Sequence, residues 1–152
     1  MQTILNVSTN LLRDYTDFEK VNDNWNILSY LNYNYDINAA LSFSKLFFPD
    51  FIEENGCIVL SFLYNKENFN EWFDEFNGNK SEIEKMCNLY ELKDFFHIKD
   101  ERNEEVLREF GKVIQKSWEI NLSILFPQKK FCIKVFEEYN SLFLTLYQVG
   151  AA

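Results

Sequence analysis

Apolar side chains recur every three to four positions through most of the chain, which is the spacing of amphipathic helices. Helices are expected over 18–28, 37–48, 66–76, 82–96 and about 100–126. Pro49 and Pro127 are expected to end two of them, because proline disfavours the helical conformation in the residue before it. Residues 37–48 are apolar around most of the helix, and such a helix is usually buried. This segment is therefore expected at the centre of the fold.

A residue that can cap a helix precedes each of these segments. Two of the caps have the spacing of a capping box, in which a Ser or Thr accepts from a backbone N–H and a Glu three residues later reaches back. These two are Thr16 with Glu19 and Ser81 with Glu84. In chain order, the expected caps are Thr16, Asp36, Asn65, Ser81, and either Asp100 or Asn103.

Three shorter segments have the pattern of strands. Residues 57–64 form a continuous apolar run after the turn signal Asn55-Gly56, as a buried strand does. Residues 131–136 and 142–149 alternate and are joined by 137–141, which predicts a closing β-hairpin. The pattern thus predicts an α+β fold, with about five helices packed on a small, mostly antiparallel three-stranded sheet with a C-terminal β-hairpin.

The remaining segments are less regular. Residues 31–35 alternate and are expected to connect two helices, whereas residues 1–15 are compatible with a docking strand, a short helix or a poorly ordered end. The chain has neither an internal repeat nor a low-complexity linker, so its 152 residues are expected to form one domain, 1–152.

Composition supports a globular chain with a large aromatic core. Hydrophobic residues make up 47% and charged residues 26% of the chain, and the aromatic share is 18%. Aromatic side chains carry much apolar area each, which favours a core built from rings. The sequence has neither an apolar run long enough to cross a bilayer nor a basic and apolar leader, so no membrane association is expected.

The net charge of the chain indicates which classes of partner are expected. The formal net charge is −9 and the pI about 4.6. Nucleic acids attract patches of Lys and Arg, and the longest basic run is Lys129-Lys130, so nucleic-acid binding is not expected. An acidic surface serves solubility, and it also speeds the encounter with a basic protein.

Cysteine and histidine usage narrows the chemistry. Cys57, Cys87 and Cys132 lie far apart among apolar neighbours, which predicts free thiols and a reducing, cytoplasmic location. His97 is the single histidine, so a zinc site built on several histidines is excluded. Phosphate-binding loops, a nucleophile elbow and a CxxC pair are absent from the sequence. We therefore expect neither a cofactor nor a metal nor an enzymatic activity.

Carboxylates gather in the stretch 50–75, which holds seven acids and one base, Lys66. Three interpretations stay open: a solvated face, a docking surface for a basic protein, and a metal or acid–base site. The stretch lacks the spacing of a calcium loop. The candidate partner-binding residues are Asp50, Glu53, Glu54, Glu67, Glu71, Asp74 and Glu75.

A segment that includes the start of the first expected strand carries a resemblance. It runs LFFPDFIE over 46–53 and GCIVL over 56–60, followed by Asn68 and Trp72. This segment resembles a group of small bacterial proteins of about this length whose activity is uncharacterised. The resemblance implies a bacterial origin and assigns no functional residue.

The leading hypothesis is a non-enzymatic protein-binding module that neutralises a basic partner, as immunity proteins do with toxins. It rests on the net charge and on the acids of 50–75. One alternative is a small enzyme that uses carboxylates or a metal, which needs two acids converging in one pocket. Another is an oligomeric accessory subunit, which needs an exposed apolar patch. The sequence leaves the oligomeric state open.

Overall fold

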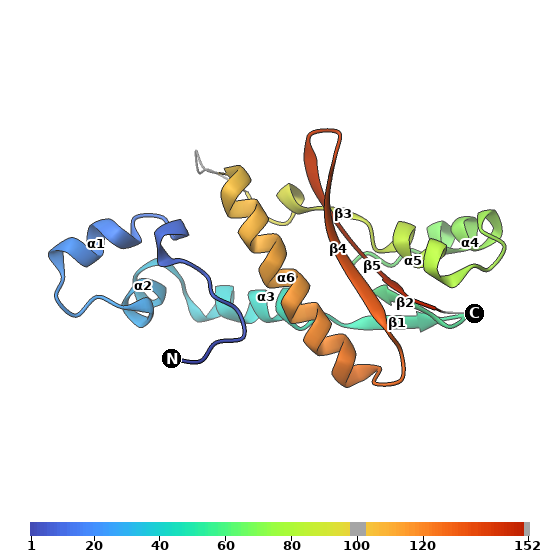
Figure 1. The fold of residues 1–152 in the computed structure, drawn as a ribbon, viewed down its shortest axis with the longest axis horizontal. Helices are drawn as coiled ribbons and strands as arrows, with labels where there is room; N and C mark the ends of the chain where they lie inside the picture. Colours follow the sequence, from blue (N-terminus) through green and yellow to red (C-terminus); the bar gives the residue numbers. More distant parts are fainter. Residues whose placement is uncertain (98–102, 151–152) are drawn as a thin grey trace.

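The computed structural model describes residues 1–97 and 103–150. Over these residues the chain is an α+β protein with six α-helices and two antiparallel sheets, ordered β1-β2 and β3-β5-β4 (Figure 1). The helices are α1 Tyr15–Val21, α2 Ile27–Asn34, α3 Ile37–Phe47, α4 Lys66–Glu75, α5 Lys80–Cys87 and α6 Asn103–Leu125. The strands are β1 Phe51–Glu54, β2 Cys57–Leu60, β3 Tyr90–Glu91, β4 Phe131–Glu138 and β5 Ser141–Gln148, and the 3-10 turns are η1 Thr9–Leu11 and η2 Leu92–Asp94.

The predicted α+β class and C-terminal hairpin are confirmed, but the expected single sheet of three strands is wrong. A separate two-stranded sheet exists because Asn55 and Gly56 both adopt positive φ, at 50° and 80°. These values suit the tight two-residue turn of a hairpin, which folds β1 back on β2. The expected strand 57–64 ends at Leu60, since the chain turns at residues 61–63.

The main core lies between α6 and the three-stranded sheet (Figure 1). Trp118, Ile114 and Leu122 of α6 are fully buried against the sheet, as the apolar stripe of this helix predicts. Gly111 allows the close approach, because a Cβ there would lie 3.1 Å from Leu92 and 3.2 Å from a methyl of Val135. No helix among the described residues is long and apolar enough to cross a membrane.

A second core lies between β2, α4 and α5. It contains Cys57, Val59, Phe69, Ile83 and Cys87. The intervening residues of β2 belong to the main core instead, so this strand is buried on both faces. Burial on both faces explains the continuous apolar run that the sequence shows here.

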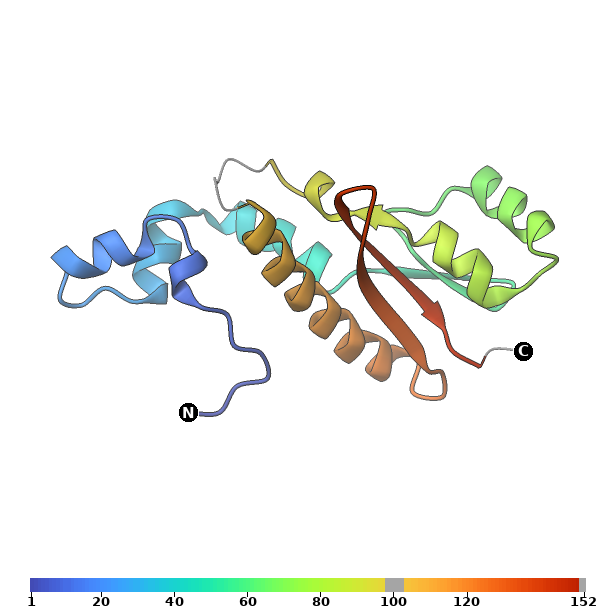
Figure 2. The same cartoon turned by 45° about the horizontal axis from the view of Figure 1, so that its top comes forward.

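The N-terminal helices lie to one side of the rest of the chain, in both Figure 1 and Figure 2. The single helix expected over 18–28 is wrong: the chain forms α1 and α2, with a loop between them. Asn26 caps the start of α2, because its side chain accepts hydrogen bonds from the N–H groups of Leu28 and Ser29. Thr16 lies inside α1 and does not cap it, and residues 31–34 are helical and not a connection.

Helix α3 leads from this N-terminal region to the main core. Asp36 caps it as predicted, since its carboxylate accepts from the N–H of Ala39 at 2.8 Å. The expected central burial is wrong, because no residue of α3 is fully buried. Only one side of the helix packs on α6, so Ile37 and Leu41 on the other side are exposed.

The segment around α5 also differs from expectation. Asn79 caps this helix, not Ser81, whose hydroxyl donates to the backbone carbonyl of Gln148 at 2.5 Å. The expected helix to Phe96 ends at Cys87, because Tyr90 and Glu91 pair with β5 as β3. Asn103 opens α6 as one of the two expected starts, and the other, Asp100, lies outside the described residues.

Candidate functional site

The structure divides the seven acids of 50–75 into two groups. Those of the first hairpin, on and beside β1, are matched by nearby cations. Asp50 pairs with Lys45 at 3.1 Å, and Glu53 with Lys129 at 3.8 Å. Glu54 is bound by the Lys66 ammonium and the Tyr64 hydroxyl. These three carboxylates are therefore locally neutralised and are poor candidates for contact with a basic partner.

The second group lies on α4 and has no such cations. Its members form none of the ion pairs within residues 1–97 and 103–150, and all of them are exposed. They are Glu67, Glu71, Asp74 and Glu75. Spacings of three and four residues place such side chains along one side of a helix. This uncompensated row of carboxylates, called here the α4 acidic face, is the candidate partner-binding surface.

The local sequence fixes the orientation of α4. Asn65 caps the helix as predicted, accepting from the N–H of Asn68 at 2.9 Å. Phe69 is fully buried in the second core, and Phe73 packs against the same core. The predicted apolar stripe of α4 is thus confirmed, and burying it turns the acids outward.

Aromatic rings border the α4 acidic face. Trp72 and Phe76 stack with ring centroids 5.5 Å apart, and both remain partly exposed. Glu71 and Glu75 each precede one of these rings in the sequence. A partly exposed Trp beside carboxylates suits an Arg of a partner, because a guanidinium binds a carboxylate and also stacks on a ring.

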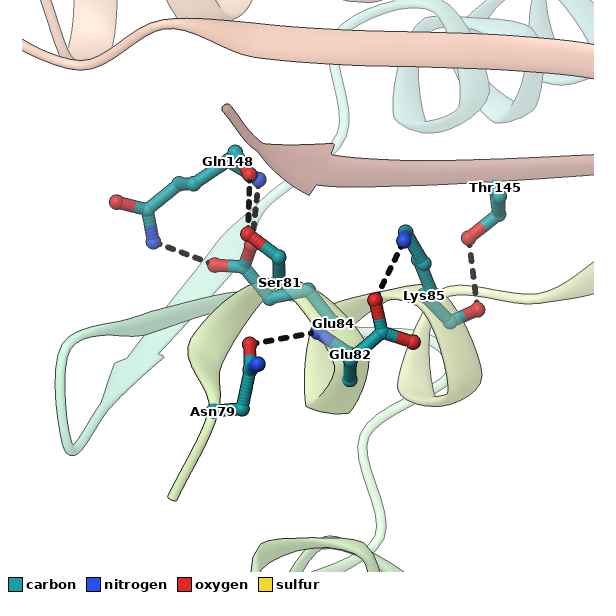
Figure 3. A network of polar contacts seen from close by, with 7 residues as sticks. All are labelled: Asn79, Ser81, Glu82, Glu84, Lys85, Thr145 and Gln148. Carbon is teal, nitrogen blue, oxygen red and sulfur yellow. Dashed lines mark hydrogen bonds and ion pairs between the residues drawn. The ribbon is translucent and has the colours of Figure 1, made fainter. Parts of the chain in front are cut away.

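The most deeply buried carboxylate of the described chain is Glu84, which sequence reasoning placed in a capping box. Its Oε1 accepts from the N–H of Ile58 at 2.7 Å and from the side-chain amide of Gln148 at 2.6 Å. Its Oε2 accepts from the backbone N–H of Gln148 at 2.6 Å. Figure 3 shows Glu84 and Gln148 facing each other between α5 and the end of β5. Glu84 is thus enclosed by backbone and amide donors and is not open to a substrate.

Asn88, the residue that follows α5 one turn after Glu84, makes the same kind of contact. Its side chain accepts from the N–H of Leu60 at 2.9 Å and donates to the carbonyls of Ile58 at 3.0 Å and Leu146 at 3.1 Å. Together with Glu84 it links the edge of β2 to β5 where the two sheets share no backbone ladder. The spacing of four residues, next to the apolar Ile83, was the one signal in the sequence that this pair faces inward.

Burial changes the pKa values of the acidic groups in this region. It raises the pKa of Glu84, while hydrogen bonds from Gln148 and Ile58 and the charge of Lys129 lower it in part. Burial also raises the pKa of the Cys57 and Cys87 thiols to about 11, with the Glu84 carboxylate adding to the shift. The two thiols are therefore protonated at neutral pH and are poor nucleophiles.

Three surface clefts meet at Phe96, which lines all of them. The largest, of about 640 Å³, also contains His97 and the charged side chains of Lys93 and Arg108. Both cations are already paired, Lys93 with Glu91 at 3.0 Å and Arg108 with two glutamates at 3.0 and 2.8 Å. The other two clefts, of about 370 and 280 Å³, are mostly apolar. These clefts could hold a small molecule, but they offer no uncompensated cluster of charge.

Within the described ranges, no group of three or more His, Cys, Asp or Glu side chains is arranged to hold a metal ion. Comparisons of the chain with family models, curated proteins and solved structures give no match. The resemblance of the segment 46–60 to a group of bacterial proteins thus stays a prediction.

Proposed function

We propose that this chain is a non-enzymatic protein-binding module of the bacterial cytoplasm that neutralises a basic partner through the α4 acidic face. The observation that carries the proposal is the absence of ion pairs for Glu67, Glu71, Asp74 and Glu75 within the described residues, while the acids of the first hairpin are all paired. Carboxylates that lack an intramolecular cation keep their full attraction for the cations of another protein.

The position of α4 supports this role. The helix lies at one end of the molecule, away from α1 and α2 (Figures 1 and 2). A partner can therefore approach it without contacting the N-terminal helices. The net charge of −9 steers a basic protein toward the chain over longer distances, and the α4 acidic face fixes where it binds.

The thiols support the cytoplasmic part of the proposal. Cys57 and Cys87 both lie in the second core and both are free. Neighbouring cysteines that remain thiols are typical of a reducing compartment. A carboxylate enzyme would need two acids that converge on one pocket. Glu104 and Glu137 both line the largest of the three clefts, but both are paired with Arg108, which makes them poor candidates for acid–base or metal chemistry.

The proposal is tested first by capture of a basic protein from a bacterial lysate at low salt, followed by elution at high salt. Association of the purified pair is then measured by stopped flow. Glu71→Lys with Asp74→Lys is expected to slow association about tenfold or more, because it reverses charge at the contact. The slowing should shrink as salt is added, since screening weakens the attraction.

A matched control separates local contact from net charge. Glu19→Lys with Asp23→Lys raises the net charge from −9 to −5, as the α4 pair does, but on exposed positions of the N-terminal region. This control is expected to change the association rate much less than the α4 pair. Equal rates for the two double variants would remove the α4 acidic face from the interface.

A further inference from the structure

Helix α3 has apolar side chains on two opposite sides. At about 100° per residue, Phe43, Leu46 and Phe47 share the side that packs toward the main core. Ile37 and Leu41 are separated by one turn on the other side, where they are 76% and 64% exposed. Core packing explains only the first side, and within residues 1–97 and 103–150 the second side is left exposed.

The exposed side of α3 is held in a fixed position. The indole N–H of Trp118 donates to the carbonyl of Leu46 at 2.8 Å, and the amide of Asn121 donates to the carbonyl of Phe47 at 2.9 Å. The hydroxyl of Ser117 also donates to Phe47. These bonds satisfy carbonyls at the end of α3 and attach it to α6. The exposed apolar side of α3 therefore belongs to a helix that is held in place against α6.

Helix α2 continues the apolar surface. Its inner side contributes Tyr30 and Tyr33 to an aromatic cluster with Trp25. Its outer side exposes Leu28, which is 72% accessible, and two further apolar residues, Ile27 and Leu31. Only Tyr35 and Asp36 separate α2 from α3, and Tyr35 is itself exposed.

This surface carries almost no charge. Between Asn24 and Ser44 the only charged residue is Asp36, whose carboxylate is used to cap α3. A partner recognised by its basic charge gains nothing here, because there are no carboxylates to meet it. A second copy of a chain with net charge −9 needs such a surface, since any charged contact between two copies is mostly repulsive.

The exposed area also fits self-association. Five large apolar residues on the outer sides of α2 and α3 are each 45% or more exposed. Together they expose on the order of 550 Å², so two copies would bury about 1,100 Å², which exceeds the roughly 1,000 Å² expected of a specific interface. An exposed apolar surface of this extent is often an interaction site. The five are Ile27, Leu28, Leu31, Ile37 and Leu41.

We propose that the chain is a homodimer in which the outer sides of α2 and α3 pack against the same surface of a second copy. Rows of residues four apart, such as Ile37 and Leu41, are the ridges that interdigitate when two helices pack. The contact is independent of the α4 acidic face, which lies at the other end of the molecule (Figures 1 and 2). One chain can therefore use both surfaces at once.

The test is the mass of the full chain in solution, measured by light scattering and sedimentation over a range of micromolar concentrations. The expected mass is twice 18.3 kDa, and it should persist at high salt because the contact is apolar. Ile37→Glu with Leu41→Glu is expected to weaken dimerisation about 100-fold or more, since it places unpaired charges in the contact. Circular dichroism checks that the double variant remains folded.

The matched control is Ile124→Glu with Leu125→Glu, which changes two exposed apolar residues of α6 in the same way. This control is expected to remain dimeric. A monomeric wild type would overturn the proposal and leave the surface to a different protein. An assembly that survives the α3 substitutions, or that is weakened equally by the α6 pair, would place the contact elsewhere and also overturn it.

Discussion

Glu84 and Gln148 are joined twice at the seam between the two sheets. The carboxylate accepts from the backbone N–H of Gln148 and from its side-chain amide, both at 2.6 Å. The same amide donates to the carbonyl of Gly56 at 2.8 Å. One buried side chain of α5 thus connects the end of β5 to the first hairpin, where backbone pairing between the sheets is missing.

Replacing this carboxylate is expected to destabilise the fold. Glu84→Gln substitutes an NH₂ donor for one acceptor, so that two buried donors face each other. A loss of about 2 kcal/mol in the free energy of unfolding at neutral pH is expected, as for a buried polar group that loses its partner. Denaturant unfolding measures it. Glu82→Gln, in the same helix and partly exposed, is the control and should cost less than 1 kcal/mol.

Protonation of Glu84 gives stability a defined pH dependence. A carboxyl group whose pKa is raised by folding stabilises the fold fully below its unfolded value and loses that contribution as the pH rises through the raised value. The difference in unfolding free energy between wild type and Glu84→Gln should therefore shrink as the pH rises above the ordinary carboxyl value of 4.5 and through the raised pKa of Glu84. A difference that grows over this range would show that the N–H donors outweigh burial.

The three thiols are expected to differ in reactivity. Cys57 and Cys87 are buried with pKa values of about 11, so at pH 8 only about one thiol in a thousand is ionised. Cys132 is partly exposed and should react first with a thiol reagent such as DTNB. Urea should release the other two. In the control variant Cys132→Ser, the fast phase of the reaction with DTNB should disappear. A second rapidly reacting thiol in the native chain would contradict the assignment.

A single substitution at the tip of the C-terminal hairpin is expected to stabilise the chain. Tyr139 has a φ of 50° and is 89% exposed. It therefore adopts the unfavourable left-handed conformation, and its exposed ring gains little packing energy to offset that cost. Tyr139→Asn should stabilise the chain by about 0.5–1 kcal/mol, because Asn favours that conformation in two-residue turns. Thermal or denaturant unfolding measures the gain. Tyr139→Phe should leave stability unchanged, and a loss in the Asn variant would reveal a contact of the tyrosine ring.

Local patterns were enough for several elements. The cap at Asn65, the buried stripe of α4 and the C-terminal hairpin were all predictable, since each depends on residues close together in the sequence. The α+β class follows from the same patterns. Strands β1 and β3 were not predictable, because they exist only through their pairing with β2 and β5.

The candidate site was predictable in part. The sequence identified all seven acids of 50–75, but it did not distinguish the paired from the unpaired ones. That distinction depends on contacts such as Glu53 with Lys129, which are remote in the sequence. The exposure of α3 was also missed, because a helix that is apolar all round reads as buried whether or not a second layer covers it.

The sequence by itself determined most of the helices, the C-terminal hairpin and the apolar faces of α4 and α6, because periodicity and capping act within a few residues. Only the tertiary structure decided which polar groups have a hydrogen-bond or ion-pair partner within the chain. The packing of α5 between two sheets turns Glu84 into a buried acceptor. Lys66, the one lysine of α4, pairs with Glu54 of β1, which leaves the four acids of α4 without an ion pair among the described residues. Both outcomes depend on where distant segments meet, and hydrogen bonds and ion pairs act only at such short range.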